Sequence, residues 1–146
     1  MGDQLSPSAV EASQRVRAVI GPLRRRVVSA GDSGDITLSQ ASVLARLADG
    51  NGLTASDLAD AEGVRHQSMT STVTALLGLG LVKRRPDPRD GRRLLVTVTA
   101  KGRRRVEEGR QARGEWLAGK LQENCTEEER RTVLAAMAVL ERLVHE

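Results

Sequence analysis

Arginine side chains are concentrated in one short segment, residues 84–98, which reads RRPDPRDGRRLLVTV. Five of its residues are arginines and two are aspartates. A guanidinium group carries its donors in a planar fork, so it binds phosphate oxygens and the acceptor edge of guanine through paired hydrogen bonds. The first question is therefore which structure presents these side chains, and to what partner.

The second half of this segment alternates in the manner of a β-strand. One face is expected to carry Leu94, Val96 and Val98, and the other Leu95, Thr97 and Thr99. Residues 81–85 provide a partner strand, and Asp90-Gly91 is a strong signal for a tight turn. The sequence thus predicts a β-hairpin, here called the wing.

The tip of the wing is where the charged residues gather. The candidate contact residues are Arg89, Asp90, Arg92 and Arg93. Asp87 or Asp90 is expected to pair with an arginine and fix its direction. A solvated charged turn is the plain alternative, so the interpretation depends on the preceding segment.

Residues 54–80 have the spacing of two short helices joined by a tight turn. Thr54 can cap the first helix, and Ala59 is small enough to let the second helix approach. Gly63 supplies the turn, and the corner is expected to be packed by Leu58, Val64 and Met69. This is the pattern of a helix-turn-helix, whose second helix lies in the major groove of DNA.

The start of that second helix is rich in donors and acceptors and has no acidic residue. The candidate DNA-binding residues are Arg65, His66, Gln67, Ser68, Thr70 and Ser71. Glutamine can form a bidentate pair with adenine, and arginine can reach guanine or phosphate. A polar helix face is the alternative, but the adjacent basic hairpin favours a winged helix-turn-helix. Its wing arginines would be attracted to the narrow minor groove of A·T-rich DNA.

The two ends of the chain are predicted to form amphipathic helices. The first spans residues 8–29, although Gly21-Pro22 can kink it or mark its true start. Thr126 and the glutamates behind it open the last helix, which extends to about residue 145. Both helices carry apolar stripes too extensive for lone surface helices, which predicts a homodimer.

Two more helices complete a mainly α fold with one small hairpin. Thr37 and Gln40 form a capping box before a short helix, and Thr99 caps the helix that follows the wing.

Composition limits the class of protein. The 146 residues suffice for one domain, and 39% hydrophobic with 29% charged residues is typical of a globular protein. The formal net charge of +4 and the pI of about 10.2 permit a basic face that binds nucleic acid. One Trp without Tyr or Phe argues against the aromatic stacking that holds single strands.

Enzymes, metalloproteins and membrane proteins are disfavoured. No Ser-His-Asp set, glycine-rich phosphate loop or metal-ligand spacing is present in the sequence, so no catalytic residue, metal or cofactor is predicted. The apolar run at residues 133–140 is too short to span a bilayer, and a cytoplasmic location is expected. Gly2 and Ser6 match a bare myristoylation pattern, which is too permissive to predict the modification.

Residues 63–102 resemble the recognition helix and wing of the MarR (multiple antibiotic resistance regulator) family of bacterial winged-helix repressors. The matching motifs are QSMT, GLVKR, Asp-x-Arg-Asp-x-Arg and VTVTAKG. The chain departs from the family at Arg65, where a polar capping residue is frequent, and at Ser71 and Ala75, where arginine is frequent.

The resemblance implies an obligate homodimer, with the first and last helices interleaved, that binds a pseudo-palindromic DNA operator. It also implies release by a small anionic or phenolic ligand, whose pocket residues cannot be assigned from sequence, or by cysteine oxidation. The whole chain, 1–146, is then one MarR-like domain. Its winged helix-turn-helix lobe is residues 36–99, and its helical dimerisation region is residues 8–30 and 100–146.

Three alternatives to a ligand-released repressor stay open. The chain is also compatible with an activator, and with a winged helix used for protein contacts or non-specific DNA compaction. A cysteine redox sensor is the third, but the lone Cys125 lies between the last two helices, not near the N-terminus as in oxidation-sensing relatives. The adjacent residues Glu127, Glu128 and Glu129 oppose thiolate formation, which favours a structural role.

Overall fold

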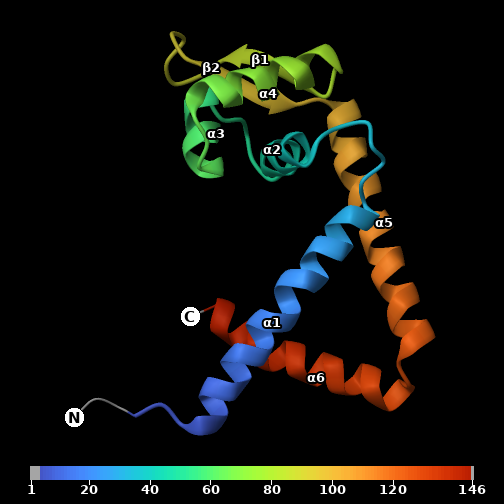
Figure 1. The fold of residues 1–146 in the computed structure, drawn as a ribbon. Coiled ribbons are helices and arrows are strands. Elements are labelled where there is room, and N and C mark those ends of the chain that lie inside the picture. The colour runs from blue at the N-terminus through green and yellow to red at the C-terminus, as the bar shows by residue number, and fades with distance from the viewer. Residues whose placement is uncertain (1–3, 146) are drawn as a thin grey trace. The chain divides into compact units, whose positions relative to one another are not determined.

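The computed structural model describes residues 4–145, which include six helices and one two-stranded antiparallel sheet (Figure 1). The helices are α1 (Pro7–Ala30), α2 (Leu38–Ala48), α3 (Ala55–Glu62), α4 (His66–Gly78), α5 (Ala100–Asn124) and α6 (Glu127–Val144). The strands are β1 (Val82–Pro86) and β2 (Leu94–Val98). The expectation of a mainly helical fold with one small hairpin is confirmed. Gly2 of the myristoylation pattern lies outside the described residues.

Two compact units divide the chain. The winged unit comprises residues 31–111, and the helical unit combines the residues up to Ala30 with those from Ala112 onward. Helix α5 begins in the winged unit and ends in the helical unit. Within residues 4–145, none of the helices is both long enough and apolar enough to cross a membrane.

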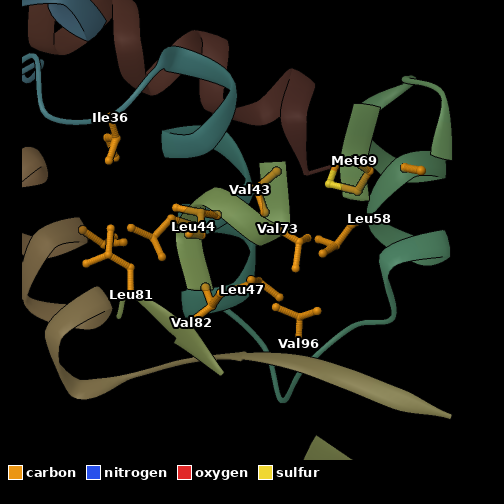
Figure 2. Close-up of a cluster of buried hydrophobic side chains, with 13 residues drawn as sticks. Ile36, Val43, Leu44, Leu47, Leu58, Met69, Val73, Leu81, Val82 and Val96 are labelled. Atoms are coloured by element: carbon orange, nitrogen blue, oxygen red, sulfur yellow. The ribbon is translucent and has the colours of Figure 1, made fainter. Parts of the chain in front are cut away.

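One hydrophobic core holds the winged unit together (Figure 2). Its most deeply buried side chains come from α2, α3, α4 and the hairpin: Val43, Leu44, Leu47, Leu58, Met69, Val73, Leu76 and Val96. On α4 the buried residues Met69, Val73 and Leu76 recur in steps of four and three, so they form a single stripe. The remaining faces of α4 are therefore free to carry polar side chains.

Threonine capping boxes start α2, α3 and α6. Thr37, Thr54 and Thr126 each accept a hydrogen bond from the amide three residues later, and that residue's side chain accepts from the threonine amide. The predicted box of Thr37 with Gln40 is thereby confirmed, as are the caps at Thr54 and Thr126.

The turn of the helix-turn-helix differs from prediction at one residue. Gly63 ends α3 in the left-handed conformation at φ 66°, as a glycine in this place should. Leu58 and Met69 are buried at the corner, but Val64 is 45% exposed. The expectation that Val64 packs the corner is wrong. Its amide is bonded to the Ala59 carbonyl at 3.0 Å, which holds it on the outside of the turn.

The hairpin is present, but its turn is not the predicted one. Val82 pairs with Val98 and Pro86 with Leu94, which leaves residues 87–93 as the connection. The Arg93 amide donates to the Asp90 carbonyl at 3.0 Å, so the tight turn is centred on Gly91 and Arg92 instead of Asp90-Gly91. Gly91 also lacks the positive φ of a two-residue hairpin turn. Pro88 has no amide to extend the ladder, and the Asp87 amide closes the loop on the Arg93 carbonyl at 2.9 Å.

Leu53 forms an isolated β-bridge with β2, which the sequence pattern does not predict. Leu53 and Val96 exchange two backbone hydrogen bonds of 3.1 and 2.8 Å at the other edge of β2. The preceding Gly52 has φ 111°, and a Cβ there would lie 2.8 Å from Thr97 Cγ2. The loop after α2 is thus fastened against the wing, and only glycine fits this crossing.

Many apolar side chains of the helical unit are exposed to solvent. Helix α1 runs unbroken through Pro22, so the interpretation of Gly21-Pro22 as its start is wrong. Among the described residues, neither α1 nor α6 has a buried side chain. Val19 is 59% exposed and Leu134 is 69% exposed. The Arg26 guanidinium lies 5.7 Å from the centre of the Trp116 ring, within cation–π range.

Candidate nucleic-acid interface

All six candidate residues at the start of α4 are exposed. They are Arg65, His66, Gln67, Ser68, Thr70 and Ser71. They surround the first two turns of the helix, away from the buried stripe of Met69 and Val73. The core thus fixes α4 from one side, and the opposite side presents mixed donors and acceptors to solvent.

Hydroxyl groups on this surface are already ordered. Thr70 Oγ1 donates to the His66 carbonyl at 3.1 Å, and Ser71 Oγ donates to the Gln67 carbonyl at 3.3 Å. Because each hydroxyl donates its hydrogen to a carbonyl of the helix, its oxygen lone pairs remain available as acceptors. The surface of α4 therefore has a defined pattern of hydrogen-bonding groups before any partner binds.

The beginning of α4 has no side-chain cap. Arg65 occupies the N-cap position with φ −68° and ψ 145° but makes no capping hydrogen bond. The other described helices begin with a hydroxyl that accepts an early amide hydrogen bond: Ser6, Thr37, Thr54, Thr99 and Thr126. The leading amides of α4 are consequently left for an external acceptor, and phosphate oxygens suit a helix N-terminus.

Carboxylates in the wing loop order its backbone. Asp87 Oδ1 accepts from the Arg89 amide at 2.9 Å, and Asp90 Oδ1 accepts from the Arg92 amide at 3.1 Å. These are side-chain turns that fold the loop locally. The expectation that Asp87 or Asp90 pairs with a guanidinium is wrong. Both carboxylates instead accept hydrogen bonds from main-chain amides.

Two arginines tie the wing to the rest of the winged unit. Arg93 Nη2 lies 3.4 Å from Asp57 Oδ2, in the first turn of α3. Arg85 Nη2 donates to the Asn51 carbonyl at 2.7 Å. Arg89, Arg92 and Arg93 are all exposed, but Arg93, a predicted contact residue of the wing tip, is also paired with Asp57.

Asp57 is held in its charged form. Hydrogen bonds from Thr54 are the main cause that lowers the pKa of Asp57 below its ordinary value, and the charge of Arg93 adds to them. One carboxylate therefore serves the capping box of α3 and the anchor of the wing together. The sequence predicts the cap at Thr54 but not the contact of Asp57 with Arg93.

The start of α5 is fastened to the winged unit by a close approach and an ion pair. A Cβ on the buried Gly102 would lie 2.0 Å from the Leu81 carbonyl oxygen, so the helix contacts the backbone directly there. Arg105 Nη2 lies 2.8 Å from Asp35 Oδ1. The hydrogen bond from Arg105 holds the pKa of Asp35 far below its ordinary value, and Ser33 adds to this effect.

Cys125 lies in the link between α5 and α6 and is half-buried. Its amide donates to the Leu121 carbonyl at 3.1 Å, and its carbonyl accepts a hydrogen bond from Arg130. These contacts use its backbone alone, so the structural or incidental role of its thiol stays a prediction.

The structure brings the predicted residues into one compact unit. All ten candidate residues are exposed on the winged unit, six at the start of α4 and four in the wing loop. Asp57, Arg85 and Gly102 were missed as positioning residues. Their partners lie 20 or more residues away in sequence, so no local pattern could reveal them.

Comparison with known proteins agrees with this geometry. The MarR family model matches residues 34–93. An uncharacterised HTH-type (helix-turn-helix) transcriptional regulator of Mycobacterium bovis is 41% identical over 99 residues, which are 68% of this chain and 69% of that protein. A Pseudomonas aeruginosa structure described as a transcriptional regulator gives a TM-score of 0.79 at 29% identity, over 97% of this chain and 99% of its own.

A third comparison extends the agreement in fold. A mutant of MepR from Staphylococcus aureus, solved bound to an oligodeoxyribonucleotide, gives a TM-score of 0.67 at 22% identity. The alignment covers 91% of this chain and 97% of that one. The family model spans α2 to the wing loop, which is the part that carries the candidate interface. This chain therefore belongs to the MarR family of DNA-binding helix-turn-helix transcriptional regulators.

Proposed function

We propose that this protein represses transcription by binding a pseudo-palindromic operator as a homodimer, and that a small ligand releases it. The observation that carries the proposal is the joint exposure of polar side chains on α4 and of arginines in the wing loop of one compact unit. A protein that binds in a groove of duplex DNA needs such a surface. The side chains that contact base edges must be exposed and must be held in place by a rigid core.

In this proposal α4 lies in the major groove. Gln67 reads an adenine through a bidentate pair, and Arg65 reaches a guanine or a phosphate. The uncapped amides at the start of α4 support a phosphate contact there, which would set the depth of the helix in the groove.

The wing is proposed to enter the adjacent minor groove through Arg92, with Arg89 beside it. Arg92 is one of the two central residues of the turn between Asp90 and Arg93, so its side chain starts from the tip. The turns made by Asp87 and Asp90 order the loop beforehand, which reduces the entropy lost on binding. A narrow A·T-rich groove attracts a guanidinium most strongly.

The exposed apolar surface of the helical unit supports the proposed homodimer. Exposed apolar side chains occur along both terminal helices, among them Val19, Ile20 and Leu23 on α1 and Leu134, Met137 and Leu143 on α6. A second copy is the proposed cover. Two copies related by a twofold axis would present two α4 helices to two half-sites of one operator.

The proposed effector is a small anionic or phenolic compound. A hollow of about 520 Å³ in the helical unit is lined by Arg25, Arg26, Ser29, Ala30 and Trp116. Two guanidinium groups can bind a carboxylate or phenolate, and the indole offers a face for an aromatic ring. This volume lies within the range of small-molecule sites.

The deciding experiment is selection of bound duplexes from a random DNA pool, followed by competition between the selected operator and random duplex at matched salt. We expect the operator to bind at least a hundredfold more tightly, because specific sites exceed non-specific ones by about 10³ or more. Equal affinity for both duplexes would instead indicate a DNA-compaction protein.

Transcription in vitro from the selected operator then distinguishes repression from activation. Small aromatic acids should restore transcription from the repressed template and should fail to do so when Arg25 and Arg26 are both replaced by glutamine. Stimulation of the unliganded template by the protein would contradict the repressor proposal.

A further inference from the structure

A second basic feature lies at the base of the wing, on the side of the sheet opposite α4. A hollow of about 250 Å³ is lined by three cationic residues, Lys83, Arg85 and Arg103, together with Gly50, Asn51, Thr97 and Val98. None of the described residues that line it is acidic. Nothing in the proposed DNA contacts uses this hollow.

The pleat of the sheet explains which way the hollow faces. Val82 and Val96 are buried in the core together with α4. Lys83 and Thr97 follow them directly and are paired with each other in the strand register. Because neighbouring residues of a strand point to opposite faces, these two side chains lie on the side away from the core.

The two guanidinium groups are held in place without being neutralised. Arg85 Nη2 donates to the Asn51 carbonyl at 2.7 Å, and Arg103 Nη1 donates to the Ala48 carbonyl at 3.1 Å. A carbonyl oxygen fixes the direction of a guanidinium but carries no net charge, so both groups keep a full positive charge. The nearby Asp49 carboxylate is bonded to Arg110 at 2.9 Å.

This arrangement differs from that of three other arginines of the winged unit. Arg46, Arg93 and Arg105 each pair with a carboxylate at 2.8 to 3.4 Å. At the hollow, three positive charges are instead concentrated around one space with donors left over. Such a group of cations attracts an anion.

We propose that this hollow binds a phosphate group. Arg85 and Arg103 would each offer their remaining N–H donors, Lys83 would supply a third charge, and the Thr97 hydroxyl could add a neutral donor. A volume of about 250 Å³ exceeds that of several waters, at about 30 Å³ each. It is below the range of about 300–1,000 Å³ usual for drug-sized ligands. One phosphate group, free or attached to a larger molecule outside, fits these bounds.

Two sources could supply the phosphate group, a free phosphate-bearing molecule or the DNA backbone. Lys83 and Thr97 point away from the core to which α4 contributes, so a duplex held by α4 is the less favoured source. A free phosphate-bearing molecule is therefore the expected occupant. Arg85 also fastens the loop after α2 to β1, so occupancy would act on the base of the wing.

The test is a titration of the full-length protein with inorganic phosphate, followed by amide chemical shifts, with chloride at equal ionic strength as the reference. We expect saturable shifts at Asn51, Lys83 and Thr97. Lys83→Gln and Arg103→Gln should each weaken binding about fivefold or more. Arg84→Gln, which removes the adjacent exposed charge from the other face of β1, should leave phosphate binding unchanged.

Equal weakening by all three variants, or shifts that chloride reproduces, would overturn the proposal. The titration is then repeated with saturating duplex DNA. Retained phosphate binding identifies a free phosphate-bearing molecule as the occupant, whereas displacement by DNA identifies a backbone phosphate as its source.

Discussion

At the scale of single residues, Gln67 is the sharpest test of base reading. It is exposed in the first turn of α4 and makes no contribution to the buried stripe. We expect Gln67→Ala to weaken operator binding by about 1–3 kcal/mol, the scale of one bidentate contact to a base. Binding to random duplex should change little, since that binding depends on phosphate charge.

The control for this variant is Thr74→Ala, which removes an exposed polar group two turns further along α4. It should leave both affinities unchanged, as measured by fluorescence anisotropy at one salt concentration. A loss of equal size on operator and random DNA would mean that Gln67 positions the protein and reads no base.

A substitution at Arg92 tests whether the wing enters the minor groove. A guanidinium inside the minor groove is attracted by the negative potential of narrow A·T-rich DNA, whereas one at a phosphate is indifferent to sequence. Arg92→Ala should therefore lose more affinity on an operator with A·T pairs beneath the wing than on one with G·C pairs there. Titrations of both proteins on both operators at fixed salt measure the difference.

Arg93→Ala is the matched comparison, because Arg93 is already held near Asp57 at 3.4 Å. It should weaken both operators alike, through loss of the anchor of the loop. If Arg92→Ala behaves in the same way, with equal losses on both operators, minor-groove insertion is rejected.

At the scale of the elements, the close approach of α5 to the backbone of Leu81 leaves no room for a side chain at position 102. A Cβ at position 102 would lie 2.0 Å from the Leu81 carbonyl oxygen and 2.8 Å from Val98 Cγ2. We expect Gly102→Ala to lower the free energy of unfolding by about 1–3 kcal/mol, as overpacking does, despite the better helix propensity of alanine. Thermal unfolding followed by circular dichroism measures this change.

Gly114→Ala on the same helix provides the control. A Cβ there meets no atom within 4 Å, so the helix propensity of alanine should raise stability by up to about 1 kcal/mol. Opposite signs for the two variants are expected. A stabilising Gly102→Ala would show that α5 can shift away from Leu81 without cost.

The elements also show what could be predicted from sequence. Capping boxes such as Thr37 with Gln40 depend on residues three apart, so the sequence locates them well. The face of α4 was predictable because one apolar stripe determines it. The shape of the wing loop was not, because it depends on the distant pair of Arg93 with Asp57 and on the strand position of Leu53.

At the scale of the whole molecule, the two units differ in how they bury apolar surface. The winged unit has a complete core, whereas the described parts of α1 and α6 bury no side chain. A chain that folds stably usually covers stripes of this kind, and exposed patches mark contact surfaces. Substitutions in the helical unit can therefore test how the protein assembles, and they leave the candidate DNA-binding residues unchanged.

We expect the protein to sediment at twice the 15.7 kDa mass of one chain at micromolar concentration. Met137→Glu places a charge in the repeated apolar stripe of α6, where the side chain is 43% exposed in one chain. Burial of that charge between two copies would be costly, so the variant should shift strongly toward the monomer. It should also lose operator affinity, because one α4 helix alone reads half a palindrome.

Thr132→Glu introduces the same charge at a polar, exposed position of α6 and should remain dimeric. Circular dichroism of both variants checks that the winged unit stays folded, since its core contains no residue of α6. Sedimentation equilibrium measures the mass of each. A wild-type protein that is a stable, folded monomer at micromolar concentration would contradict the homodimer and would require each operator half-site to be bound independently.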